Sequence, residues 1–108
     1  MSQKLENTNR IKSTVFHALS DPVRLEILEF LRDGEKCVCE IVPHLNLIQP
    51  VVSRHLKILK DSGMVVDRKE GNKRLYSTTF PEIYRIVDDV TPKLASRLSK
   101  KMIEQMIC

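Results

Sequence analysis

The stretch from Cys37 to Val65, CVCEIVPHLNLIQPVVSRHLKILKDSGMV, constrains the fold of this chain more than any other segment. Its first part is short and apolar and predicts a helix over about residues 38–45. Asn46-Leu47-Ile48 then forms a turn, and Gln49-Pro50 opens a second helix with proline in the first turn, where its missing N–H is not needed. Two short helices joined by such a turn form a helix-turn-helix, predicted here over residues 38–62.

The second of these helices has one apolar and one basic side. At about 100° per residue, Val52, Leu56 and Leu59 cluster on one side. The opposite side carries Ser53, Arg54, Lys57 and Lys60. Many ordinary surface helices have this pattern, but a basic helix of this kind also fits a DNA major groove, which is about 12 Å wide.

The basic charge of the chain is concentrated in the same region. Between Ser53 and Arg74 there are seven Lys and Arg residues but only three Asp and Glu residues, an excess of four. The whole chain has a net charge of +4, so the other segments balance to zero. A localised excess predicts a polyanionic partner, although a solvated charged surface gives the same count.

A basic hairpin is predicted directly after the second helix. Ser62-Gly63 ends that helix, and Met64-Val65-Val66 and Leu75-Tyr76-Ser77-Thr78 are then predicted as two strands. Gly71-Asn72 between them is a hairpin turn signal. A helix-turn-helix followed by a basic hairpin over residues 64–79 has the layout of a winged helix, in which the hairpin, or wing, reaches toward phosphates beside the groove.

Two helices are predicted before this unit. Residues 1–8 are polar and are predicted to be a flexible arm, whereas apolar residues at helical spacing predict a helix over about residues 9–19. Ser20-Asp21-Pro22 is a helix-start signal, and Gly34 ends the helix that it opens.

An apolar stripe runs through the last part of the chain, residues 81–107, and predicts a C-terminal helix. Thr91-Pro92 interrupts it, so we expect a kink near Pro92 or a break with Thr91 capping a new segment. A stripe this long exceeds what a small core can cover. The simplest partner for the surplus is an identical chain, so we expect a homodimer.

The length and composition favour one small helical domain. The chain has 108 residues, of which 42% are hydrophobic, and this suffices for one modest core. No stretch approaches the roughly 18 apolar residues of a membrane span, and no export signal is apparent, so we expect a cytoplasmic protein with no membrane partner. Three cysteines, an odd number, argue against a disulfide framework and predict free thiols.

Three ordered motifs resemble the ArsR/SmtB family of winged-helix metalloregulatory repressors, in its thiol or arsenite-type branch. They are ALSDPVRLEILEFL (18–31), EKCVCEI (35–41) and QPVVSRHLKILKDSGMV (49–65), followed by the wing. The resemblance implies a mainly α fold with a small β-hairpin, a winged helix-turn-helix that dimerises through its first and last helices. It covers roughly residues 10–90 and also implies that the protein binds a two-fold operator in double-stranded DNA and is released by an inducer. We expect residues 1–108 to form one such domain.

The same resemblance implies the DNA-contacting residues. They are Gln49, Ser53 and Arg54 at the bases, Lys57 at a phosphate, and Arg68, Lys73 and Arg74 in the wing. The chain departs from the family's sequence pattern at two positions. Many members carry a hydroxyl residue where this chain has Ile48, and often another where it has Val51. Losing a helix cap costs roughly 1 kcal/mol, and the operator sequence cannot be transferred from relatives.

Cys37 and Cys39 match the pair that thiol-type members use to bind arsenite, antimonite or a soft divalent metal ion as inducer, with no organic cofactor. Thiolates favour such ions, although a buried cysteine also packs as a small hydrophobe. Residues two apart on a helix point about 200° apart, so both sulfurs can reach one ion only if the start of this helix is non-helical or unwinds. Pro43 is tolerated only near the first turn of a helix, which predicts that the regular helix starts near Cys39 or Glu40. Arsenite normally takes a third sulfur, for which Cys108 is the candidate, with a solvent ligand as the alternative.

Two rival functions use the same cysteines. In a winged-helix redox sensor Cys37 and Cys39 are oxidised, whereas a small thiol reductase uses one of them as a nucleophile at a helix N-terminus. No strand is predicted before the pair and no nucleophile with a neighbouring base is apparent, so we expect no enzyme. A dimer that does not bind DNA fits the localised charge less well.

Overall fold

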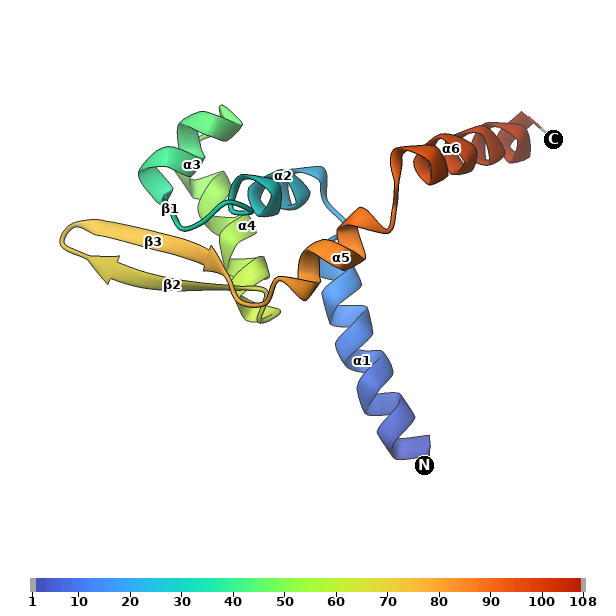
Figure 1. Ribbon diagram of the computed structural model, residues 1–108, viewed down its shortest axis with the longest axis horizontal. Helices are drawn as coiled ribbons and strands as arrows, with labels where there is room; N and C mark the ends of the chain where they lie inside the picture. Colours follow the sequence, from blue (N-terminus) through green and yellow to red (C-terminus); the bar gives the residue numbers. More distant parts are fainter. Residues whose placement is uncertain (1, 108) are drawn as a thin grey trace.

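The computed structural model describes the backbone of residues 2–107 and the side chains of residues 7–107. The elements are α1 (Ser2–Ala18), α2 (Pro22–Phe30), β1 (Lys36–Cys37), α3 (Val38–Leu45), α4 (Gln49–Asp61), β2 (Val65–Glu70), β3 (Lys73–Thr78), α5 (Glu82–Asp88) and α6 (Pro92–Ile107). Figure 1 shows α2, α3, α4 and the hairpin gathered into one body, from which α1 and α6 extend in different directions.

The core lies where α2, α3 and α4 meet. Its fully buried side chains are Ile27, Leu28, Ile41, Val52, Leu56, Leu59 and Val65. The apolar side predicted for the second helix of the helix-turn-helix is confirmed, because all three of its residues have no exposed surface. The mainly helical fold with a small hairpin is confirmed as well, and α3 and α4 occupy the predicted helix-turn-helix segment.

The sheet has one strand more than the hairpin predicted from the sequence. Strands β2 and β3 pair antiparallel around Gly71, whose φ of 61° suits the turn that Gly71-Asn72 predicts. Strand β1 pairs antiparallel with β3, with Lys36 opposite Tyr76 and Cys37 opposite Leu75. The wing is therefore attached to the start of α3 by backbone hydrogen bonding.

Helix α1 is longer than predicted. It begins at Ser2, so residues 2–8, predicted to be a flexible arm, are helical, and the predicted start at residue 9 is wrong. The polar composition misled the prediction, since Gln, Lys, Leu and Glu are good helix formers and no Gly or Pro interrupts them.

The C-terminal stripe is divided between two helices. Helix α5 ends at Asp88 and α6 begins at Pro92, so the chain breaks there instead of kinking. Thr91 caps α6, because its Oγ1 accepts a hydrogen bond from Leu94 N at 3.1 Å. Within the described chain no residue of α6 is buried, and its apolar side chains Leu94, Leu98, Met102, Ile103 and Met106 face solvent. No helix of the described residues has the length and apolarity needed to cross a bilayer.

Candidate nucleic-acid interface and cysteine pair

Helix α4 begins without a side-chain cap. Ile48 is its N-cap residue in extended conformation, and only its carbonyl takes part, accepting hydrogen bonds from Val51 N and Val52 N at 3.1 and 3.2 Å. Pro50 lies in the first turn, as predicted. The Ile48 side chain is 67% exposed, so a solvent-facing apolar group stands where many family members carry a hydroxyl residue.

The solvent side of α4 carries four of the residues predicted to contact DNA. Gln49, Ser53, Arg54 and Lys57 are all exposed. Lys57 pairs with Asp61 one turn later at 2.9 Å, whereas Arg54 has no ion-pair partner among the residues that the structure describes. An exposed, unpaired guanidinium on the basic side of the helix is free to bind an external acceptor.

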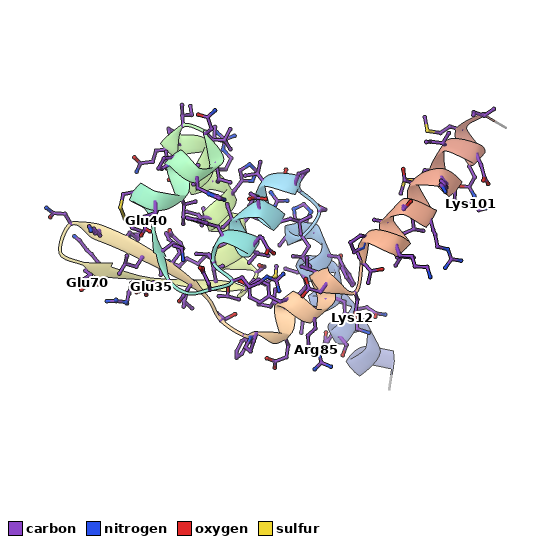
Figure 2. The ribbon with its side chains drawn as sticks, turned by 45° about the horizontal axis from the view of Figure 1, so that its top comes forward. Lys12, Glu35, Glu40, Glu70, Arg85 and Lys101 are labelled. Carbon is purple, nitrogen blue, oxygen red and sulfur yellow. A yellow bond between two sulfur atoms is a disulfide. The ribbon has the colours of Figure 1, made fainter. Side chains whose placement is uncertain are left out.

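Most of the cations predicted in the wing are paired with carboxylates. Arg68 donates to Glu35, which precedes β1, at 2.8 Å and to Glu70, the last residue of β2, at 3.0 Å; both glutamates are labelled in Figure 2. Arg74 pairs with Asp67, whereas Lys73 has no ion-pair partner in the described part of the chain. The structure thus separates the predicted wing residues into one free cation and two cations that must exchange a carboxylate for a phosphate.

Asp67 joins the wing to α4. Its side chain is 8% exposed and accepts from Lys60 of α4 at 2.9 Å as well as from Arg74 of β3. The hydrogen bond from Lys60, followed by the one from Arg74, holds the pKa of Asp67 below its ordinary value. This carboxylate, which the sequence reasoning counted only as a charge opposing the basic excess, positions the wing beside the helix.

Cys37 and Cys39 are joined by a disulfide, and this differs from the free thiols predicted. The sulfurs meet because Cys37 is the N-cap of α3, in extended conformation with φ −73° and ψ 148°, and lies outside the helix. Its Sγ also accepts from Cys39 N at 3.0 Å, and Glu40 Oε1 accepts from Cys37 N at 3.1 Å. Helix α3 therefore starts at Val38, before the predicted Cys39 or Glu40, and tolerates Pro43 in its interior.

The two cysteines differ in accessibility. Cys37 is 4% exposed, whereas Cys39 is exposed. Val42 lies near the pair, and Cys108, the predicted candidate for a third sulfur ligand, lies outside the described residues. The described residues contain no cluster of three or more Cys, His, Asp or Glu side chains suited to a metal ion.

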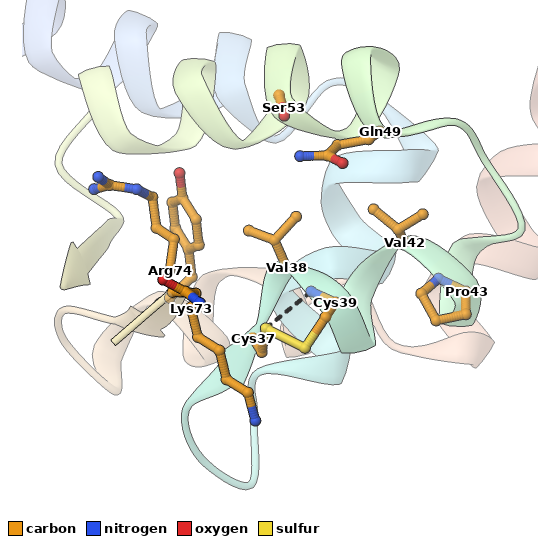
Figure 3. A pocket seen from close by; sticks show the side chains of 11 residues that line it. Cys37, Val38, Cys39, Val42, Pro43, Gln49, Ser53, Lys73 and Arg74 are labelled. Carbon is orange, nitrogen blue, oxygen red and sulfur yellow. Dashed lines mark hydrogen bonds between the residues drawn. A yellow bond between two sulfur atoms is a disulfide. The ribbon is translucent and has the colours of Figure 1, made fainter. Parts of the chain in front are cut away.

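A groove of about 520 Å³ connects the cysteine pair with the predicted DNA-contacting residues. Figure 3 shows its three sides: Cys37 at the end of β1 with Val38, Cys39 and Val42 of α3, then Gln49 and Ser53 of α4, and Lys73 and Arg74 of β3. Of the residues predicted as DNA or metal ligands, the groove brings together Cys37, Cys39, Gln49, Ser53, Lys73 and Arg74. Arg54, Lys57 and Arg68 do not line it.

Arg24 is a buried residue that the sequence analysis does not single out. It is 6% exposed, and its guanidinium donates to Ala18 O at 2.7 Å and to His17 O at 3.1 Å. Its third contact is His55 Nδ1 of α4, at 3.1 Å. This arginine connects the end of α1, the first turn of α2 and the middle of α4, and a lone arginine in an amphipathic pattern gives no signal of such a role.

Comparisons with known proteins agree with this architecture. Residues 21–66 match the family described as bacterial regulatory protein, arsR family. The arsenical resistance operon repressor of Staphylococcus aureus is 42% identical over 82 residues, which cover 76% of this chain and 75% of the repressor. The repressor of the same name from Staphylococcus xylosus is 48% identical over 64 residues, and the chain spans 62% of its length.

A solved structure has the same fold over nearly the whole chain. It is the homodimeric winged helix-turn-helix DNA-binding domain of Mb0332 from Mycobacterium bovis, described as a possible ArsR-family transcriptional regulator. The TM-score is 0.74 at 25% identity, and the match covers 97% of this chain and 93% of that domain.

Proposed function

Because this chain belongs to the arsR family of bacterial regulatory proteins, a family of transcriptional regulators and not of enzymes, we propose that it is a repressor that binds operator DNA and leaves it when an inducer binds. The observation that carries the proposal is the arrangement of α4. One side of this helix is fully buried in the core, the other side is exposed and carries Arg54, and the wing is held beside it by Asp67. Such a helix enters a major groove while the wing follows the phosphates.

The proposed DNA-binding form is a homodimer. Operators are read as two half-sites related by a two-fold axis, which a symmetric dimer matches. The exposed apolar side chains of α6 give each chain a surface that a second copy can cover, and the similar Mycobacterium bovis domain is homodimeric. In this proposal α1 and α6 form the contact, and the two α4 helices face the operator together.

The proposed inducer is a thiophilic metalloid or metal ion, with arsenite or antimonite first, held by the reduced sulfurs of Cys37 and Cys39. The extended conformation of Cys37 brings both sulfurs to one side of the chain, so the pair can bind one ion with α3 starting at Val38. Thiolates select soft ions, and repressors of arsenical resistance operons are among the similar proteins. A solvent or anion ligand completes the site in place of a third thiol.

A redox sensor is the second candidate, and the disulfide between Cys37 and Cys39 favours it. Oxidation joins the same two sulfurs that must be reduced to bind a metalloid ion. The two functions therefore exclude each other at any moment and differ in which reagent releases DNA from the reduced protein.

The first prediction separates these two candidates. The assay uses reduced protein bound to a labelled duplex that the protein has selected from random sequences. Arsenite or antimonite is expected to release this duplex at low concentration, whereas peroxide should require a much higher concentration. Fluorescence anisotropy measures the release, with cadmium, lead and zinc ions in the same panel. Cys37→Ser and Cys39→Ser are expected to keep DNA binding and lose the response.

Cys37→Ser is the sharper of the two variants. Serine is a favourable N-cap residue, so its hydroxyl replaces Cys37 Sγ as acceptor for Cys39 N and α3 keeps its start. If this variant unfolds, as judged by circular dichroism, the cysteines are needed for packing and not for sensing. Release by peroxide at the lower concentration identifies the redox sensor instead.

The second prediction tests α4 as the reading helix. Arg54→Ala is expected to weaken binding to the selected duplex by about 1–3 kcal/mol, roughly 5- to 150-fold, because a bidentate contact to a guanine edge is lost. The loss should be small on a duplex of unrelated sequence, and anisotropy titrations on both duplexes measure it.

Lys57→Ala is the matched comparison for Arg54→Ala. Lys57 lies one turn further along the same exposed side and is proposed to contact phosphate, so its removal weakens both duplexes alike. The slope of log K against log salt should fall in magnitude by about 1. Unchanged affinity in both variants means that α4 does not read the DNA.

A further inference from the structure

Residues proposed to bind the inducer and residues proposed to bind DNA line the same groove between α3, α4 and β3. One side holds the disulfide-linked cysteines, and the other two hold Gln49 and Ser53 of α4 and Lys73 and Arg74 of the wing. We propose that a backbone phosphate segment of the bound DNA occupies this groove, so that any group held on Cys39 competes with DNA for the same space. The inference rests on the proposed DNA binding and specifies how that binding is regulated.

The lining of the groove suits a phosphate. Its lining residues include Lys73 and Arg74, of which Arg74 is paired with Asp67, together with Gln49 and Ser53. No acidic side chain lines it among the residues that the structure describes. Lys73 has no carboxylate partner there, so an incoming phosphate meets an uncompensated cation, which is how proteins commonly hold the DNA backbone.

The cysteine that enters the competition is Cys39. It is exposed at the start of α3, whereas Cys37 is buried and turned toward the Cys39 amide. A thiophilic ion or a reagent therefore reaches the Cys39 sulfur first. Any ligand that remains there stands inside the groove, opposite the wing cations.

The position of the cysteines also removes the need for a distorted helix. Both sulfurs already lie together while α3 starts at Val38, so binding at the pair does not require α3 to unwind. DNA is then released because the ligand bound at the cysteines occupies the groove with its volume and its charge. Linkage makes the effect reciprocal, because DNA must weaken ligand access to Cys39 by the same free energy.

The test uses the full chain with Cys39 as its single thiol, in the Cys37→Ser, Cys108→Ser background. The N-cap serine keeps the start of α3, and circular dichroism verifies the fold. The thiolate of Cys39 is treated with three alkyl methanethiosulfonates whose ethyl group ends in sulfonate, hydroxyl or trimethylammonium. The thiolate displaces methanesulfinate from each reagent and forms a mixed disulfide. The sulfonate and trimethylammonium adducts have comparable size and opposite charge, and the hydroxyl adduct is a smaller neutral group.

We expect the sulfonate adduct to weaken DNA binding most, by at least roughly tenfold relative to the trimethylammonium adduct, because a like charge opposes the phosphate. We also expect saturating duplex to slow the modification of Cys39. At a duplex concentration 100 times Kd the rate falls by up to about 100-fold, since only free protein reacts. Arg85→Cys in a background without other cysteines is the control, because this exposed position on α5 lies outside the groove and should react at an unchanged rate.

Three outcomes overturn the inference. Equal weakening by all three adducts shows that Cys39 acts through a change of conformation and not through the groove. An unprotected Cys39 in the DNA complex shows that no phosphate segment covers it. If the unmodified protein binds no duplex at all, the proposed function fails first and this inference fails with it, whereas DNA binding with either of the other two results overturns this inference alone.

Discussion

Leu98→Glu is expected to dissociate the protein into folded monomers and to abolish tight operator binding. Leu98 lies in the exposed apolar stripe of α6 and is not among the side chains of the core or those packed against it, so the folded monomer should tolerate the change. In a two-fold interface each substitution occurs twice, and burying one leucine contributes about 1.5–3 kcal/mol. The dimer dissociation constant should therefore rise by on the order of 100-fold or more, as sedimentation at a series of protein concentrations measures.

Lys100→Glu is the control for this prediction. It introduces the same side chain on the opposite, polar side of α6 and changes the charge by more than Leu98→Glu does. If charge alone weakened the dimer, the control would be the more severe variant. A Leu98→Glu protein that stays dimeric and binds DNA normally means that α6 is not the contact between the subunits.

The parts of the fold that depend on local pattern were predictable from the sequence. The buried face of α4 follows from the spacing of Val52, Leu56 and Leu59, because residues of one helical face must share one core. The break before α6 follows from Thr91-Pro92, since proline cannot continue the preceding helix and threonine caps the next.

The parts that depend on distant partners were not predictable in this way. Strand β1 has two residues, too few for any alternation, and exists because β3 offers it a free edge. The pairing of Arg68 with Glu35 joins residues 33 positions apart. Charge counting therefore placed the basic excess in residues 53–74 but could not separate free cations from neutralised ones, and it treated Asp67 as an opposing charge when it positions the wing.

The cysteine pair combines both cases. The resemblance to thiol-type regulators pointed to these two residues, and helical geometry correctly required that they not both lie in one regular helix. The structure meets this requirement locally, because Cys37 is the N-cap of α3 and only Cys39 lies in the helix. A capping role for cysteine is uncommon, since Ser, Thr, Asp and Asn are the usual residues, so the pattern alone did not predict where α3 begins.

Arg24→Ala is expected to have the largest effect on stability, lowering the free energy of unfolding by about 3 kcal/mol. The buried guanidinium donates to the buried carbonyl of Ala18 and to the part-buried carbonyl of His17 and contacts His55, and alanine removes this charged donor from all three. Arg24→Lys should be intermediate, because one ammonium cannot reproduce the fixed geometry of the guanidinium. Urea unfolding at fixed protein concentration, followed by circular dichroism, measures the change.

Arg54→Ala is the matched control, because it removes an arginine that is exposed and has no ion-pair partner in the described chain. Its stability should stay within about 0.5 kcal/mol of the parent protein while its affinity for DNA falls. Arg24→Ala, assayed at a temperature where it remains folded, should also bind DNA more weakly, since its guanidinium holds α4 through His55 against the end of α1. Unchanged urea midpoints for Arg24→Ala contradict the prediction. A loss of stability with full DNA affinity limits Arg24 to folding and means that α1 and α4 are positioned independently of this contact.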